Sequence, residues 1–173
     1  MGRIIVDTLQ WQYNLTWQLA SEYHLSSLSD EECHWQPAEN CWAVFQLPDG
    51  TWGHDWADEE PASAPSVTIG WITWQIIWWW SGLLASYKRE LPPDHQAVKW
   101  PENAAGVRAT LHELHTQWSE ILAELCDNDL EQGFSFPWPE PQPFRLAIAW
   151  SNSELMKNVA EIGILRHCYQ NRK

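Results

Sequence analysis

The sequence predicts an all-α protein, a four-helix bundle formed by a single domain over residues 1–173. Four segments carry apolar residues at helical spacing, and long connections rich in proline and glycine separate them. A chain of 173 residues suffices for one domain with a sizeable core. Its 15 tryptophans should make that core rigid and could wall a pocket.

The first helix is expected over residues 4–25. Its apolar residues recur at i, i+7, i+11 and i+15, namely Ile4, Trp11, Leu15 and Leu19. This stripe is expected to face the core. A short helix should follow, because Ser29 and Glu32 have the spacing of a capping box.

A long irregular crossover is expected between the first and second long helices, over residues 37–65. Proline and glycine interrupt it too often for a long element. Its tryptophans indicate that it packs over one end of the bundle, and a short hairpin around Asp49 and Gly50 is also compatible with the sequence.

Three further long helices complete the predicted bundle. They are expected over residues 68–88, over residues 103–126, and from Ser151 to about Tyr169. The last is expected to begin at Ser151 because Ser151 and Glu154 have the spacing of a second capping box. A proline-rich connection over residues 136–143 precedes it.

Gln75 lies within the most apolar of these helices. Trp71, Trp74, Gln75 and Trp78 stand at i, i+3, i+4 and i+7, so they share one helix face that should point inward. The segment is apolar enough to suggest a membrane span. Its polar residues Gln75 and Ser81 favour a buried helix instead.

Charge and composition exclude several function classes. The net charge of −13 argues against binding to nucleic acid or to anionic membrane surfaces. The N-terminal residues lack the apolar run of a secretory signal. The four cysteines show no Cys-x-x-Cys spacing, so reduced thiols in a cytoplasmic protein are expected.

Few residue patterns indicate catalysis. His112 and His115 stand at i, i+3 and could share a metal, but partly solvated histidines are the simpler interpretation. Glu154, Asn158 and Glu161 form a polar stripe on the last helix, and the capping box accounts for Glu154 alone. For Asn158 and Glu161, a pocket role and structural hydrogen bonding both stay open. No nucleophile motif or glycine-rich phosphate loop is present in the sequence.

Segments along most of the chain resemble the DinB/YfiT-like superfamily. The matching segments are residues 28–32, 35–37, 41–44, 49–52, 55–56, 65–71, 152–158 and 160–166. The resemblance implies a four-helix bundle with a long crossover. It also implies a divalent ion, often nickel or zinc, held by three histidines, and in some members a thiol-dependent transferase activity. It further implies pairing into homodimers.

This sequence departs from the implied metal site at every ligand. Gln75 stands where the second long helix would supply a histidine, and Glu154 and Asn158 stand in place of the pair on the last helix. Amide oxygens are poor ligands for the ions that imidazole binds well. A degenerate site without a cofactor is therefore expected, although an oxygen-rich pocket could hold magnesium or calcium weakly.

Three functions remain open from the sequence. The favoured one is a non-catalytic protein that binds a small molecule in an aromatic pocket lined by Gln75, Glu154 and Asn158. The neighbours expected around that pocket are Trp71, Trp74, Trp78 and Glu161. The alternative is a thiol transferase or hydrolase-like enzyme that keeps nickel, zinc or magnesium through substituted ligands. The third is a structural protein whose polar cluster satisfies itself by hydrogen bonds.

Overall fold

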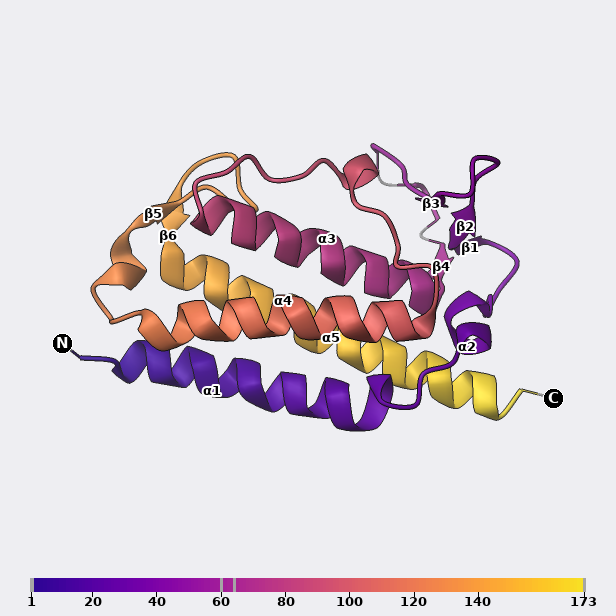
Figure 1. Ribbon diagram of the computed structural model, residues 1–173, viewed down its shortest axis with the longest axis horizontal. Helices are drawn as coiled ribbons and strands as arrows, with labels where there is room; N and C mark the ends of the chain where they lie inside the picture. Colours follow the sequence, from indigo (N-terminus) through magenta and orange to yellow (C-terminus); the bar gives the residue numbers. More distant parts are fainter. Residues whose placement is uncertain (1, 60, 64, 173) are drawn as a thin grey trace.

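The computed structural model describes residues 2–59, 61–63 and 65–172. Its main elements are four long helices that lie side by side in Figure 1. They are α1 (Ile4–Leu19), α3 (Ile69–Tyr87), α4 (Ala104–Glu124) and α5 (Phe144–Gln170). Helices α1 and α3 each pack against both α4 and α5. The predicted all-α class is confirmed.

Shorter elements join the long helices. The helical ones are the π-helix η1 (Ala20–Leu25), α2 (Asp30–His34), and the 3-10 helices η2 (His95–Ala97) and η3 (Asp129–Glu131). The strands are β1 (Cys41–Trp42), β2 (Val44–Gln46), β3 (Trp52–His54), β4 (Ser66–Val67), β5 (Gly133–Phe134) and β6 (Gln142–Pro143). These strands form three two-stranded ladders, so they brace connections and build no central sheet.

The crossover between α2 and α3 covers the end of the molecule where α3 begins (Figure 1). Strands β2 and β3 form an antiparallel hairpin in which Phe45 pairs with Gly53. Its turn contains Gly50 at a φ of 85°, a conformation that glycine adopts without steric cost. The hairpin expected around Asp49 and Gly50 is therefore present. Strands β1 and β4 then pair in parallel and lead into α3.

Helix ends agree with most of the predicted boundaries. Ser29 caps α2 with a complete capping box, since its side chain accepts from the Glu32 N–H and the Glu32 carboxylate accepts from the Ser29 N–H. Thr68 caps α3, and Asn103 caps α4. In each case the side-chain oxygen satisfies an N–H that has no partner within the helix.

Helix α5 begins earlier than the sequence predicts. It starts at Phe144, directly after Pro143, and Ser151 lies in its third turn. The Ser151 hydroxyl donates to the Ile148 carbonyl oxygen, so the second capping box was a wrong prediction. The spacing of Ser151 and Glu154 was misleading because the same residue types also occur inside helices, where the hydroxyl bonds back to the preceding turn.

Helix α1 turns a different face to the core than expected. Val6, Tyr13 and Thr16 are its buried residues. The predicted stripe is instead exposed, with 66% of the Trp11 surface and 41% of the Leu15 surface accessible. The apolar pattern was misleading because the buried face of α1 includes Thr16 and a tyrosine whose hydroxyl is hydrogen-bonded to His115.

A buried ion pair joins α2 to the C-terminal part of α5. The Arg166 guanidinium donates to both carboxylate oxygens of Glu32, at 2.9 and 3.1 Å. It also donates to the carbonyl oxygens of Tyr23, His24 and Ser27 at the end of η1. Arg166 is only 8% exposed, so this ion pair is shielded from solvent.

Within the described residues, no helix is both long and apolar enough to cross a membrane. Helix α3, the segment that suggested a span, contributes twelve buried residues to the core. Trp74, Tyr13 and Trp118 are among the largest fully buried side chains.

Cys33, Cys41 and Cys168 carry free thiols.

Candidate functional site

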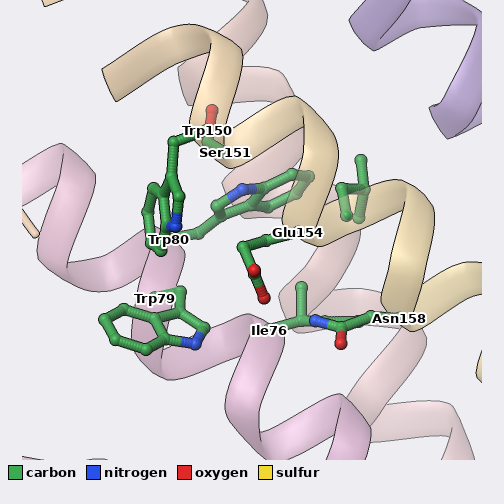
Figure 2. A pocket seen from close by; sticks show the side chains of 8 residues that line it. Ile76, Trp79, Trp80, Trp150, Ser151, Glu154 and Asn158 are labelled. Carbon is green, nitrogen blue, oxygen red and sulfur yellow. The ribbon is translucent and has the colours of Figure 1, made fainter. Parts of the chain in front are cut away.

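A cavity lies between α3 and α5 at the position where the sequence analysis expects a pocket (Figure 2). Its lining residues are Ile76, Trp79 and Trp80 from α3, and Trp150, Ser151, Glu154, Leu155 and Asn158 from α5. The cavity measures about 10 Å³. That is room for about one water molecule and too little for an organic ligand.

Helical spacing places these residues together. Ser151, Glu154, Leu155 and Asn158 stand at i, i+3, i+4 and i+7, so one face of α5 carries all of them toward α3. On α3, Ile76, Trp79 and Trp80 show the same spacing over one turn. The Trp79 and Trp150 rings meet edge to face, with centroids 5.0 Å apart, and join α3 to α5.

Glu154, Asn158 and Trp79 each contribute a polar group to the lining of this cavity. The Glu154 carboxylate pairs with the Lys157 ammonium at 2.7 Å, and Figure 2 shows it pointing into the space between Trp79 and Asn158. Asn158 is 1% exposed, and its Oδ1 has no hydrogen-bond partner among the described residues. The Trp79 Nε1 is likewise buried without a partner in that part of the chain. A buried polar group without a partner destabilises a fold by roughly 1–3 kcal/mol.

The predicted site residues do not all meet here. Glu154 and Asn158 both line the cavity. Gln75 is half-buried and is not among the lining residues. Glu161 lines a shallow groove beside Pro37 and Val67 instead, and burial raises the pKa of its carboxyl. Of the three family metal positions, the structure therefore brings two together.

Trp71, Trp74 and Trp78 also lie away from this cavity, which corrects the expectation that they neighbour it. Their indole N–H groups donate to the carbonyl oxygens of three loop residues, Asp55, Val98 and Pro93, at 2.8, 2.9 and 3.0 Å. They share a helix face as predicted, but that face holds the crossover and the α3–α4 connection against α3. The N–H of each indole is therefore hydrogen-bonded, while the rest of the ring packs against neighbouring residues.

The aromatic walls of the cavity were not predicted from the sequence. Trp79 and Trp80 belong to the same tryptophan run as Trp78, but they are rotated about 100° and 200° further round the helix axis. Their one-turn spacing to Ile76 was the available signal. Trp150 was missed because α5 was expected to begin only at the next residue.

A second, much larger cleft opens beside the crossover. Its lining residues are Phe45, Leu47, Gly53, His54, Trp56, Asp58, His95, Gln96 and Lys99, and its volume is about 430 Å³. It lies between the β2–β3 hairpin and η2. No local sequence pattern predicts this cleft, because its two histidines, His54 and His95, stand 41 residues apart.

Stacked rings form the inner wall of this cleft. The His54 ring stacks on Trp74 with centroids 3.7 Å apart, and the His95 ring stacks on Trp56 at 4.7 Å. Trp78 meets Trp56 edge to face at 5.2 Å. Trp74 and Trp78, expected in the aromatic pocket, therefore stand behind the larger cleft.

A hydrogen bond between two imidazoles links the walls of the cleft. His54 Nε2 and His95 Nδ1 lie 2.9 Å apart. Burial, together with repulsion by the nearby His95 and Lys99, lowers the pKa of His54 to about 4. His54 is therefore neutral at pH 7, and its ring can exchange one hydrogen bond with His95.

The histidine pair noted on α4 has another role. The His115 Nδ1 and the Tyr13 hydroxyl are hydrogen-bonded at 2.8 Å, and the His115 ring stacks on Trp17 at 4.2 Å. The ring centroids of His112 and His115 are 6.2 Å apart. Across the part of the chain that the structure describes, no group of three or more His, Cys, Asp or Glu side chains could hold a metal ion together.

Comparison with known protein families assigns the chain to a superfamily. The family model of the DinB superfamily matches residues 12–162, which include all of α3 and α4, most of α5 and half of α1. The chain belongs to the DinB superfamily. No curated protein and no solved structure gives a match.

In this DinB-superfamily chain, the residues at the expected metal position do not fit nickel or zinc. Glu154 is the one carboxylate that lines the cavity, and it is paired with Lys157. Asn158 offers an amide, and Gln75 lies outside the cavity. The set contains no imidazole or thiolate, the ligands that bind these ions tightly. The Trp79 indole also lines the cavity, and the partly positive hydrogen of its N–H would repel a cation.

Proposed function

We propose that this DinB-superfamily protein is non-catalytic and binds a small molecule in the cleft beside the crossover. The contrast between the two sites carries this proposal. The cleft measures about 430 Å³, against about 10 Å³ at the family position. Sites for small molecules usually measure about 300–1,000 Å³.

The cleft is held in shape before any ligand arrives, which supports a binding role. Trp71 anchors the crossover through Asp55, and Trp78 anchors the segment before η2 through Pro93. The His54–His95 hydrogen bond then ties these two segments to each other. A pre-organised site loses less conformational entropy on binding, so more of the interaction energy contributes to affinity.

The residues that line the cleft suit recognition of a planar molecule with hydrogen-bonding groups at its edge. Phe45 and Trp56 are each more than one-third exposed and offer apolar surface. The imidazoles, Gln96 and Lys99 offer hydrogen bonds around it. None of the lining residues carries a hydroxyl or thiol that an adjacent base could activate as a nucleophile. The thiol transferase alternative gains no support from this lining or from the donors at the family position.

Nuclear magnetic resonance can test the proposal, because each tryptophan contributes one indole N–H signal. A library of small heteroaromatic fragments would be titrated into the ¹⁵N-labelled protein. The expected result is that binders shift the signals of Trp56, Trp74 and Trp78. The Phe45→Ala variant should weaken these shifts. Tyr23→Ala, which removes an exposed aromatic ring from η1, should leave them unchanged.

Two outcomes would contradict the proposal. Shifts confined to Trp79, Trp80 and Trp150 would move binding to the family position. A library that shifts neither group would favour the purely structural role.

A further inference from the structure

The cavity at the family position presents hydrogen-bonding groups of both kinds. The Trp79 indole N–H can only donate, and the Glu154 carboxylate can only accept. The Asn158 amide can do either. All three side chains line a space of about 10 Å³ (Figure 2). Asn158, at 1% exposed, has no other residue in the described chain to bond its Oδ1.

The charge and size of the cavity exclude most occupants. A metal cation or an ammonium ion cannot accept the Trp79 hydrogen bond. An anion would be repelled by the Glu154 carboxylate, which pairs with the Lys157 ammonium at 2.7 Å. An organic molecule is too large for about 10 Å³.

We infer that the metal position of the family has become a binding site for one buried water molecule in this chain. The water accepts from Trp79 Nε1 and donates to Glu154. It bonds the Asn158 amide through whichever atom faces it. Buried waters typically make about three hydrogen bonds to groups that would otherwise be unsatisfied. This inference is independent of the cleft and of what binds there.

The inference accounts for an asparagine in the middle of a helix. Asparagine is a mediocre helix former, so α5 gains nothing locally from Asn158. Bridging through water allows α3 and α5 to satisfy their facing polar groups although no direct hydrogen bond joins them. Trp79, Trp80 and Trp150 then exclude anything larger, so the site is structural.

A high-resolution crystal structure of the unmodified protein tests the inference directly. The expected result is one density peak at about 2.7–3.2 Å from Trp79 Nε1, the Asn158 amide and Glu154. The peak should stay free of anomalous signal after crystals are soaked in zinc or nickel. A metal signal at this position, or no peak between these three residues, would overturn the inference.

A mutant cycle provides the second test. Trp79→Phe and Asn158→Leu each remove one group that bonds the water, so their effects should be coupled. We expect a coupling of roughly threefold to tenfold in the unfolding equilibrium constant. Trp118→Phe is the matched control, because its Nε1 is also buried without a described partner but does not line this cavity. Additive effects in the Trp79 and Asn158 cycle, as in the control cycle with Trp118, would contradict the inference.

Discussion

Asn158 and Glu154 were predictable from the sequence, whereas the walls around them were not. Both residues lie on a polar stripe of α5, and the family resemblance aligned them with metal ligands. Gln75 was aligned in the same way, yet it lies outside the cavity lining. A turn of helix covers 3.6 residues, so Gln75 stands about 100° from Ile76, which does line the cavity. Sequence spacing alone could not decide which of these neighbours faces α5.

His115 should make stability depend on pH. Burial, together with repulsion by His112, lowers the pKa of His115 from 6.5 to about 4. Between pH 6.5 and 4 the unfolded chain therefore binds a proton that the folded protein does not. Stability falls as the pH decreases through this window. His115→Gln should reduce the loss of unfolding free energy between pH 7 and 4.5, as measured by urea denaturation.

The control for this prediction is His167→Gln, at an exposed position near the end of α5. It should retain the pH dependence of the unmodified protein. An equally steep dependence in His115→Gln would show that His115 does not contribute to it.

Among the charged residues, Arg166 should be one whose substitution lowers stability most. Arg166→Met leaves the 4%-exposed Glu32 without its cation and should destabilise the protein by about 3–5 kcal/mol. Arg145→Met breaks an exposed pair with Glu131 and should cost less than about 1 kcal/mol. Chemical denaturation of both variants measures the difference. Equal losses would mean that the buried pair contributes no more than the exposed one.

At the scale of elements, helix starts were predictable where the capping side chain lies in extended backbone. Ser29, Thr68 and Asn103 all meet this condition. The start of α5 was not predictable in this way, because Pro143 precedes the helix without a side-chain cap. The proline-rich connection before it concealed the first two turns.

The two serines distinguish a real capping box from an apparent one. Ser29→Ala removes the oxygen that accepts the Glu32 N–H and should destabilise the protein by about 0.5–2 kcal/mol. Ser151→Ala removes only a bond back to Ile148 within α5 and should change stability by less than about 0.5 kcal/mol. Thermal unfolding of the two variants compares them. A larger loss for Ser151→Ala would contradict the observed helix start.

The orientation of α1 can be tested with a pair of aromatic residues. Tyr13 is 1% exposed and Trp11 is 66% exposed. Tyr13→Ala should destabilise the protein by about 3–5 kcal/mol, as large buried side chains do. Trp11→Ala should change the free energy of unfolding by no more than about 0.5 kcal/mol. The reverse order would restore the face that the sequence pattern predicted.

For the whole molecule, the all-α class and the position of the crossover followed from periodicity and from proline and glycine. The cleft did not, because it depends on contacts between the crossover and η2 that are about 40 residues apart in sequence, such as His54 with His95. Hydrogen bonds from indole N–H groups to loop carbonyl oxygens fix that arrangement, and no local sequence pattern predicts these bonds. The cytoplasmic location and the homodimer stay predictions.

The central claim is that Glu154 and Asn158, which the family resemblance aligns with metal ligands, line a small cavity whose donor groups do not fit nickel or zinc. Metal content of the purified protein, measured by mass spectrometry after dialysis against each ion and gel filtration, tests it most directly. The account predicts only substoichiometric metal, unchanged in Asn158→Leu. One equivalent of nickel or zinc in the unmodified protein, lost in Asn158→Leu, would contradict it.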